Sequence, residues 1–387
     1  MLRRDFLKAA TASMSVALVP KPVLAALINS SQYNNLLILV ELKGGNDGFN
    51  TVIPFANSAY YQLRPKIAIP RDTVLQLSQS IGLNPALKAL MPIWQANELG
   101  VLQGVGYADA SLSHFRSIEI WDTASKSNEY LEDGWLGRAF EKSPPPQAFT
   151  ADGVVMGSPE IGPMLGATAR TIVLASEAQF KRQAKLASHA DQAGNKAMQH
   201  VLRIENDILQ AASKLGGDVV LKTDFPKHAF GSICKNACQL AAQKSPVAAI
   251  RLTLSGFDTH QNQVKMHANL LTQLAEGLSA LRAGLIETNR WNSTFIMTYA
   301  EFGRRAKENQ SGGTDHGTAN MHFALGGKVR GGLLGEYPNL NSLDGVGNVR
   351  HTVDFRSIYA SVLQQWWGAD SLAVLGGNFK PVELIKT

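Results

Sequence analysis

Asp315 and His316 are adjacent in the stretch SGGTDHGTANMHFALGG, residues 311–327, between paired glycines and a short apolar run. Adjacent side chains point in different directions on a strand or a helix, but on an irregular turn both can reach one point. A carboxylate beside an imidazole on a glycine-rich turn could bind a hard or borderline divalent metal ion. Alone, such a pair is more typical of a solvated loop, so a metal site needs further ligands.

Residues of the same kinds follow other apolar runs that have the character of buried strands. In open α/β sheets, ligands bind at the carboxyl ends of the strands. Any one of these residues could cap a helix or belong to a plain loop, but their recurrence at five successive strand ends favours a metal site. They are Asp47, Asp258, His260, Glu301, the pair Asp315 and His316 described above and, at the start of a helix predicted over 113–124, Ser111, Ser113 and His114.

Predicted strands and helices alternate along the chain, which is typical of a doubly wound, mostly parallel α/β sheet sandwiched by helices. A proline cluster at 141–147 is interpreted as a surface loop, so residues 26–387 are expected to form a single α/β domain. The predicted strands are 35–47, 98–109, 170–176, 245–260, 293–304 and 321–327, and the predicted helices are 113–124, 178–242, 264–285 and 353–368.

The first 25 residues have the order of an export signal. Arg3 and Arg4 precede a mildly apolar segment that ends in small residues near Ala25. The arginine pair resembles the twin-arginine signal of bacteria, and the apolar segment is too short to span a membrane comfortably. We therefore expect residues 1–25 to be removed by cleavage, and the mature protein to be periplasmic or secreted after folded export by the twin-arginine machinery.

Charge and cysteine usage exclude other classes of function. The net charge is +6, and residues 1–25 carry four basic residues against one acidic, or +3, which leaves about +3 on the mature chain. No basic surface for nucleic acid and no stable membrane span after cleavage are expected. Cys234 and Cys238 stand four apart on one face of a predicted helix, and we interpret them as core thiols rather than half a metal site.

Several motifs together resemble the bacterial domain-of-unknown-function 1501 family, a relative of the alkaline phosphatase superfamily that includes sulfatases and phosphopentomutases. The resemblance covers most of the mature chain and implies an alkaline-phosphatase-like fold with two metal ions, without supplying a substrate. The motifs are GGNDGFNTVIPF, SHFRSIEIW, GFDTHQNQ, TYAEFGRRAKENQSGGTDHG and LGGKVRGGLLGEYPNL.

The resemblance gives each residue an expected role. Asp47 would bind one metal, and the nucleophile at a helix N-terminus would be Ser113, with Ser111 next. Asp258 and His260 would bind the other metal. The turn GGTDHG resembles the phosphopentomutase-like final step, so His316 would complete that second site while Asp315 ligates or orients it.

Phe302 departs from the superfamily pattern, because it stands with Glu301 where an Asp-His pair is expected and cannot bind metal. One site would then hold Asp258, His260 and His316, which suits Zn²⁺ or Mn²⁺. The other would be an oxygen-only set with Asp47 and Glu301, which suits Mg²⁺, Ca²⁺ or Mn²⁺, or stays empty. A competing alignment moves Asp315 and His316 into the Asp-His position and takes its last ligand from His322 or His351.

The expected function is an exported, metal-dependent hydrolase of small phosphate or sulfate esters that uses one or two divalent ions. Arg116 and Arg304, with Asn46, are candidates to hold the anion, although an arginine on a solvated face is an equal reading. The alternative is a non-catalytic periplasmic protein of the same fold that binds an anion or a protein partner. Phe302 favours this alternative.

Overall fold

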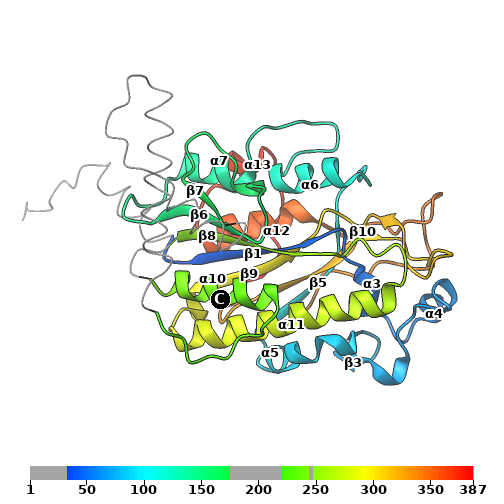
Figure 1. Ribbon diagram of the computed structural model, residues 1–387. Helices are drawn as coiled ribbons and strands as arrows, with labels where there is room; N and C mark the ends of the chain where they lie inside the picture. The colour runs from blue at the N-terminus through cyan, green and yellow to red at the C-terminus, as the bar shows by residue number, and fades with distance from the viewer. Residues whose placement is uncertain (1–32, 175–218, 244–246, 387) are drawn as a thin grey trace, which may run out of the picture.

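The computed structural model describes residues 33–174, 219–243 and 247–386 (Figure 1). The predicted signal segment 1–25 lies outside these ranges. So does much of the helical stretch predicted over 178–242, of which the described part contains the helix α10 (Ala229–Ala241).

The strand β1 (Leu36–Lys43) lies inside a sheet of nine strands formed by the described residues, and it pairs in parallel with both neighbours. The order is β13-β5-β12-β9-β1-β8-β6-β7, with β14 paired to β5. The bounds are β5 Leu99–Gly106, β6 Ala151–Met156, β7 Thr171–Leu174, β8 Val247–Ser255, β9 Thr294–Tyr299, β12 Asn320–Leu325, β13 Gly332–Leu334 and β14 Val353–Asp354.

The pairings in this sheet are parallel except those of β12, which runs antiparallel to β5 and to β9. The predicted doubly wound, mostly parallel fold is therefore confirmed. The strand predicted over 321–327 is the one that runs antiparallel to its neighbours. As a result, β12 begins at the edge where β1, β5, β8 and β9 end.

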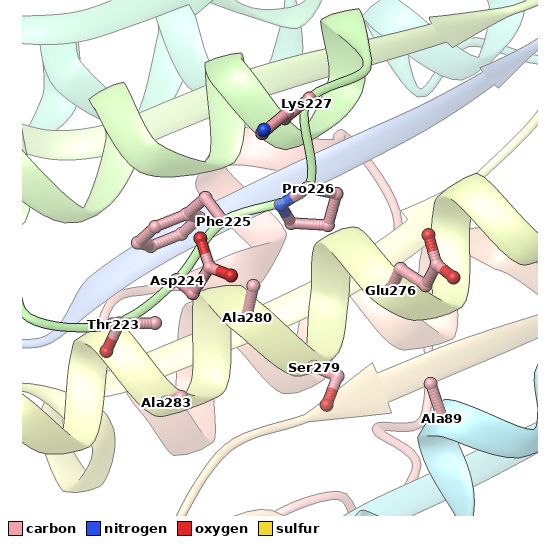
Figure 2. A pocket seen from close by; sticks show the side chains of 10 residues that line it. All are labelled: Ala89, Thr223, Asp224, Phe225, Pro226, Lys227, Glu276, Ser279, Ala280 and Ala283. Atoms are coloured by element: carbon pink, nitrogen blue, oxygen red, sulfur yellow. The ribbon is translucent and has the colours of Figure 1, made fainter.

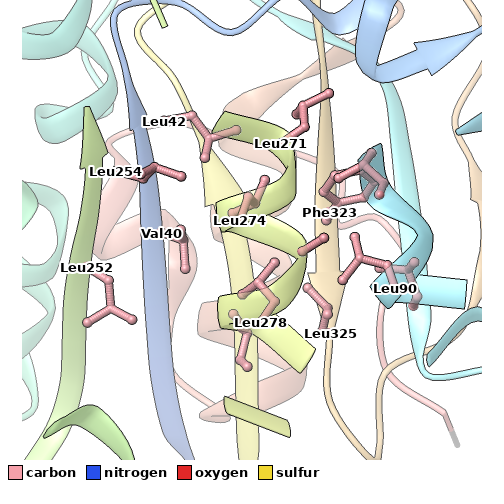
Figure 3. Packing of buried hydrophobic residues seen from close by; sticks show 14 of the residues in the cluster. Val40, Leu42, Leu90, Leu252, Leu254, Leu271, Leu274, Leu278, Phe323 and Leu325 are labelled. Atoms are coloured by element: carbon pink, nitrogen blue, oxygen red, sulfur yellow. The ribbon is translucent and has the colours of Figure 1, made fainter. Parts of the chain in front are cut away.

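Burial on both faces of the sheet explains why these segments form strands. Successive side chains of β1 enter two different apolar clusters, because side chains alternate across a strand. Figure 3 shows one of these clusters, in which strand residues pack against helix α11 (Gln263–Glu287). Its labelled members include Val40, Leu42, Leu252, Leu254, Leu271, Leu274 and Leu278.

Helices cover both faces of the sheet (Figure 1). The cluster with α10 and α11 also includes η2 and α5, and the opposite cluster is built from α6, α7, α12 and α13. Their bounds are α5 Met91–Gln95, α6 His114–Thr123, α7 Trp135–Lys142, α12 Phe355–Ser361, α13 Ser371–Leu375 and the 3-10 helix η2 Pro85–Leu90. The π-helical segment Val362–Trp366 continues α12.

Smaller elements surround the carboxyl edge of the sheet. A two-stranded ribbon pairs β10 (Gly303–Arg304) with β11 (His316–Gly317) in the segment between β9 and β12. After β1, the chain forms short helices and a three-stranded sheet in the order β2-β4-β3. These are α3 Gly48–Thr51, β2 Val52–Ile53, α4 Ser58–Leu63, η1 Arg71–Thr73, β3 Leu75–Gln76 and β4 Gly82–Leu83. Two 3-10 turns, Gly162–Met164 and Trp291–Ser293, complete the described helices.

Cys234 and Cys238 lie on the buried face of α10 against α11, and both thiols are free. A side chain at Gly284 of α11 would collide with Cys238, and one at Gly277 would collide with Phe230 of α10, so the small residues allow the two helices to pack closely. Burial raises the pKa of both thiols. This confirms the prediction of core thiols. Among the described helices, none has the length and apolar content needed to cross a membrane.

Candidate metal centre

Three side chains from three different loops meet at the carboxyl edge of the sheet. His114 begins α6, Asp258 follows β8, and His316 lies on β11. Their ligand-type atoms all lie within 4.8 Å of one another. His260 joins them from the β8 loop, since its Nε2 is 3.0 Å from Asp258 Oδ1.

Several distances between these atoms are close to the edge of a metal tetrahedron. Ligands that surround an ion at ~2.0–2.1 Å lie about 3.3 Å from one another. Asp258 Oδ1 is 3.3 Å from His316 Nε2, and Asp258 Oδ2 is 3.4 Å from His114 Nε2. The Nε2 atoms of His260 and His316 are 3.0 Å apart. His114, Asp258 and His316 therefore fit a single Zn²⁺-like or Mn²⁺-like ion, and His260 lies beside them as a candidate fourth ligand.

The other ring nitrogen of each histidine faces an oxygen that can only accept a hydrogen bond. His316 Nδ1 donates to the Leu112 carbonyl at 2.8 Å, and His114 Nδ1 donates to Glu301 Oε1 at 2.9 Å. His260 Nδ1 lies 3.5 Å from Asp315 Oδ1. A proton on Nδ1 leaves the Nε2 lone pair for a metal, which is how outer oxygens fix the tautomer of metal-binding histidines.

Glu301 and Asp315 therefore face the Nδ1 atoms of His114 and His260, and they do not join Asp258 as ligand-type groups of the centre. The carboxylate of Glu301 is buried and also accepts from the Gly44 backbone amide at 2.9 Å. Asp315 also accepts from the Asn309 side chain. Glu301 was expected to bind metal directly, whereas here it orients His114. For Asp315, the orienting role is the one of its two expected roles that this geometry fits.

Asp258 is held in its ionised form by Arg304. Burial alone would raise the pKa of Asp258, but the Arg304 guanidinium, 2.7 Å away, outweighs this and lowers it. Arg304 is fully buried and also donates to the carbonyls of Gly44, Gly45, Phe257 and Thr314. The expected binding of a substrate anion by Arg304 does not fit this geometry, because its donors are taken up by the protein.

The pKa values of two of the histidines are shifted in opposite directions. The hydrogen bond to Glu301 raises the pKa of His114, and a more basic imidazole is a stronger donor to a metal. Burial lowers the pKa of His316, which favours the neutral ring that can act as a ligand.

Phe302 lies under the histidines instead of replacing one of them. Its ring centroid is 4.4 Å from that of His316 and 4.8 Å from that of His114. Gly45 must lack a side chain here, because its φ is +79° and a Cβ would overlap the Phe302 ring. The Gly-Gly pair before Asn46 therefore lets Phe302 support the imidazoles from below.

Ser113 and Ser111 lie on the loop that leads into α6. Ser113 is the N-cap residue, it is exposed, and it stands between Leu112, which binds His316, and His114. Ser111 Oγ accepts from the Ser113 amide at 3.4 Å. Ser113 is thus next to the metal centre at a helix N-terminus, where amide groups and the helix dipole attract anions.

Asp47 and Asn46 lie in a buried layer next to the centre. Asp47 is the N-cap of α3 and forms a 2.6 Å ion pair with Arg64, whose side chain is also completely buried. Asn46 bonds with Thr51 and accepts from His267 at 2.8 Å. Neither residue is open to solvent, so the anion binding expected of Asn46 does not fit this placement.

Arg116 is engaged by the loop after α6. Its guanidinium binds the carbonyls of Lys126 and Ser127 and lies 3.9 Å over the ring of Tyr130. It also pairs with Glu119 at 2.8 Å. These contacts point to a structural task instead of the expected task in the active site, which was to hold the substrate anion. The competing ligand His322 lies inside the core against Trp121, with no polar partner for either ring nitrogen.

Sequence reasoning missed His114 as a ligand and Arg64 altogether. His114 was counted among the ligand-type residues at strand ends but was given no place in either metal site, although a histidine directly after a serine N-cap at a strand end is a usable signal. Arg64 gives no such signal, since it lies seventeen residues after Asp47 in an irregular stretch. Its role depends on how the chain after α4 folds back.

A surface groove forms elsewhere, between α11 and the segment before α10 (Figure 2). On α11, His267 contacts Asn46 beside the metal centre, whereas the first groove residue is Glu276. These two residues are nine positions apart, which is ~14 Å along the helix at 1.5 Å per residue. None of the predicted site residues lines this groove. It is lined by Ala89, Thr223, Asp224, Phe225, Pro226, Lys227, Glu276, Ser279, Ala280 and Ala283.

Comparison with known proteins gives a family and distant structural similarities. Residues 94–370 match the family described as Protein of unknown function (DUF1501). No curated protein matches the chain. A solved protein of the alkaline phosphatase superfamily from Vibrio parahaemolyticus is 9% identical, covering 89% of this chain and 69% of its own, with a TM-score of 0.43.

Two further solved structures are similar at the same low level. The lipoteichoic acid synthase LtaP from Listeria monocytogenes is 10% identical, covering 80% of this chain and 72% of its own, with a TM-score of 0.37. The C-terminal periplasmic domain of EcEptC from Escherichia coli, in complex with Zn, is 11% identical, covering 76% and 72%, with a TM-score of 0.38.

Proposed function

The chain belongs to the DUF1501 family, and from that premise we propose that it is an exported, metal-dependent hydrolase of phosphate or sulfate esters. One observation carries the proposal. Ligand atoms of His114, Asp258 and His316 lie within 4.8 Å of one another, His260 Nε2 lies 3.0 Å from Asp258 Oδ1 and from His316 Nε2, and each imidazole has its Nδ1 directed at an oxygen. Such an arrangement is built to hold a divalent ion.

The chain's own groups divide the chemistry between them. A bound ion would supply positive charge to an ester oxygen and lower the pKa of a coordinated hydroxyl. Ser113 is the proposed nucleophile, because it is exposed beside His114 at the N-terminus of α6. The first amides of α6 would attract the phosphate or sulfate group. Arg304 keeps Asp258 ionised throughout.

The centre is open enough for substrate. The side chains of Asp258 and His260 are 45% and 43% exposed, so two of the four ligands face solvent. Catalytic metal sites keep a position for water or substrate, either by having three protein ligands or by expanding their coordination. His260 is the ligand expected to yield or share its position, because its Nδ1 contact is the longest of the three.

The test is hydrolysis of a panel of aryl phosphates and aryl sulfates by the full chain loaded with Zn²⁺ or Mn²⁺. We expect activity that Ser113→Ala removes while the metal content stays unchanged. Ser111→Ala is the matched control and should keep most of the activity. Metal-loaded protein that hydrolyses no ester in the panel would contradict the proposed reaction.

A second candidate function is a non-catalytic exported protein with a structural metal ion. The observation that favours it is that four ligand-type side chains gather at the centre, since four protein ligands are typical of structural zinc sites. The His260→Ala variant separates the two candidates. A structural ion should be lost and the protein destabilised, whereas a catalytic ion should stay bound through three ligands.

A further inference from the structure

Arg64 lies inside a cage of oxygen atoms beside the metal centre. Its guanidinium donates to Asp47 Oδ2 at 2.6 Å, to Asp47 Oδ1 at 3.0 Å and to Asn50 Oδ1 at 2.8 Å. Two backbone carbonyls complete the cage, Arg305 at 2.9 Å and Ala306 at 2.8 Å. Carboxylate, amide and carbonyl oxygens are the ligands that Ca²⁺ and Mg²⁺ take in proteins.

Both carboxylate oxygens of Asp47 already have hydrogen-bond partners besides Arg64. Gln263 Nε2 donates to Asp47 Oδ2, and the Phe49 amide donates to Oδ1 at 3.2 Å. Burial alone would raise the pKa of Asp47, but Arg64 outweighs it and the pKa is lowered. A buried carboxylate with this many donors is ionised and fully satisfied, so a metal ion could bind it only by displacing the guanidinium.

The cage is connected to the metal centre through neighbouring residues. Arg305 and Ala306 follow Arg304, the residue that holds Asp258. Gln263 also accepts from Thr259 and Thr314, which adjoin Asp258 and Asp315 in the chain. Glu301, the other oxygen ligand expected for a second ion, is occupied by His114 and the Gly44 amide.

We propose that Arg64 takes the place of a second metal ion, so that the chain binds one divalent ion at His114, Asp258, His260 and His316. This inference rests on the proposed function for the existence of that single site. The fixed guanidinium balances the buried negative charge of Asp47, as a metal ion at that position would. It keeps the loops after β1 and β9 joined whether or not an ion is bound.

The direct test is metal stoichiometry of the full chain after saturation with Zn²⁺, Mn²⁺, Mg²⁺ or Ca²⁺ and removal of excess ion. We expect about one ion per chain, lost in His316→Ala and retained in Asp47→Asn. Two ions per chain, with one lost in Asp47→Asn, would overturn the inference and leave the proposed hydrolase intact. One ion per chain in a protein that hydrolyses no ester would support the inference about Arg64 and contradict the proposed hydrolase.

A second measurement examines the cage itself. Arg64→Ala leaves five oxygen atoms around an empty, buried position, and we expect it to unfold at a lower temperature. Millimolar Ca²⁺ or guanidinium should raise its Tm by several degrees, because either cation can refill the cage. Failure of both cations to stabilise a folded Arg64→Ala protein would overturn the inference. If this variant does not fold, the stoichiometry of the wild-type protein decides alone.

The chain provides a matched control in a second buried ion pair. Arg251 and Glu41 are each 1% exposed and stand 2.7 Å apart within the sheet. Arg251 donates to three oxygen atoms, those of Tyr299, the Glu160 carbonyl and Glu41, against five around Arg64, so a cation in its place would meet fewer ligands. Arg251→Ala should be destabilised without recovery in Ca²⁺. An equal rise in Tm on addition of Ca²⁺ to both variants would point to non-specific stabilisation and would overturn the inference that a cation can take the place of Arg64.

Discussion

At the scale of single residues, the atoms behind the histidines matter as much as the ligands. Glu301 and the Leu112 carbonyl each hold one imidazole by its Nδ1, and Phe302 supports two of the rings. Sequence reasoning identified Asp258, His260 and His316 because ligand-type residues followed predicted strands. It gave Glu301 and Arg304 other tasks, because the direction in which a loop side chain points is set by tertiary contacts.

Glu301→Gln is expected to weaken metal binding without removing a ligand. The amide cannot hold the His114 Nδ1 proton and the Gly44 amide as strongly as a carboxylate does. Changes to such outer partners typically cost ~10–100-fold in metal affinity. Competition titration against a chelator measures this. Asp315→Asn is the control and should lose less, because its contact to His260 is 3.5 Å long and exposed. An unchanged affinity in Glu301→Gln would contradict the orienting role.

The buried ring of His322 should make the free energy of unfolding depend on pH. Its ring is fully buried, and burial lowers its pKa to about 3 from an ordinary value of 6.5. The unfolded chain therefore takes up a proton below pH ~6.5 while the folded chain does not, so stability is lost as pH falls from that value toward 3. Between pH 7 and 4 the loss is on the order of 3 kcal/mol.

His322→Leu should remove that part of the acid sensitivity. The leucine is of similar size and buries no unpaired polar atoms, so we also expect higher stability at pH 7, by roughly 1–3 kcal/mol. Urea unfolding of both proteins at pH 7 and pH 4 gives the comparison. Equal losses of stability on acidification in the two proteins would show that His322 is not the group responsible.

At the scale of elements, three loops at one sheet edge build the centre. The alternation of strands and helices made the carboxyl edge predictable from the sequence. The direction of β12 was not predictable, because an apolar run such as MHFALGG has the same pattern in parallel and antiparallel strands. The strand β6 (ADGVVM) was missed, since its Asp and Gly residues hide a short buried strand.

A substitution in the Gly-Gly turn after β1 can test how closely these loops pack. Gly44 has φ +116°, and a Cβ there would collide with the backbone of Asp258. Gly44→Ala should cost more than the ~1–2 kcal/mol of left-handed strain alone and should also lower metal affinity, because it shifts Asp258. Thermal unfolding and metal titration report the two effects.

Gly347→Ala is the matched control for that variant. Gly347 has φ +88°, but an added Cβ meets no atom within 4 Å. It should show the backbone strain and keep full metal affinity. Similar losses of metal affinity in both variants would mean that close packing against Asp258 is not what Gly44 provides.

At the scale of the whole molecule, export remains a prediction from the sequence, since residues 1–25 lie outside the described part. Arg3→Lys combined with Arg4→Lys keeps the charge of the segment and removes the arginine pair. We expect the protein to accumulate in the cytoplasm with its N-terminal segment uncleaved. Fractionation and immunoblotting decide this, and normal yield of cleaved protein in the periplasm would refute the twin-arginine route.

The antiparallel direction of β12 affects how freely the segment before it can vary among relatives. The chain leaves the sheet at the end of β9 and re-enters it at the start of β12, on the same edge. The segment in between carries Arg304, Asp315 and His316, yet no crossing of the sheet depends on its length. Relatives could therefore lengthen or exchange it and alter the ligands, while the strands beneath keep their order and register.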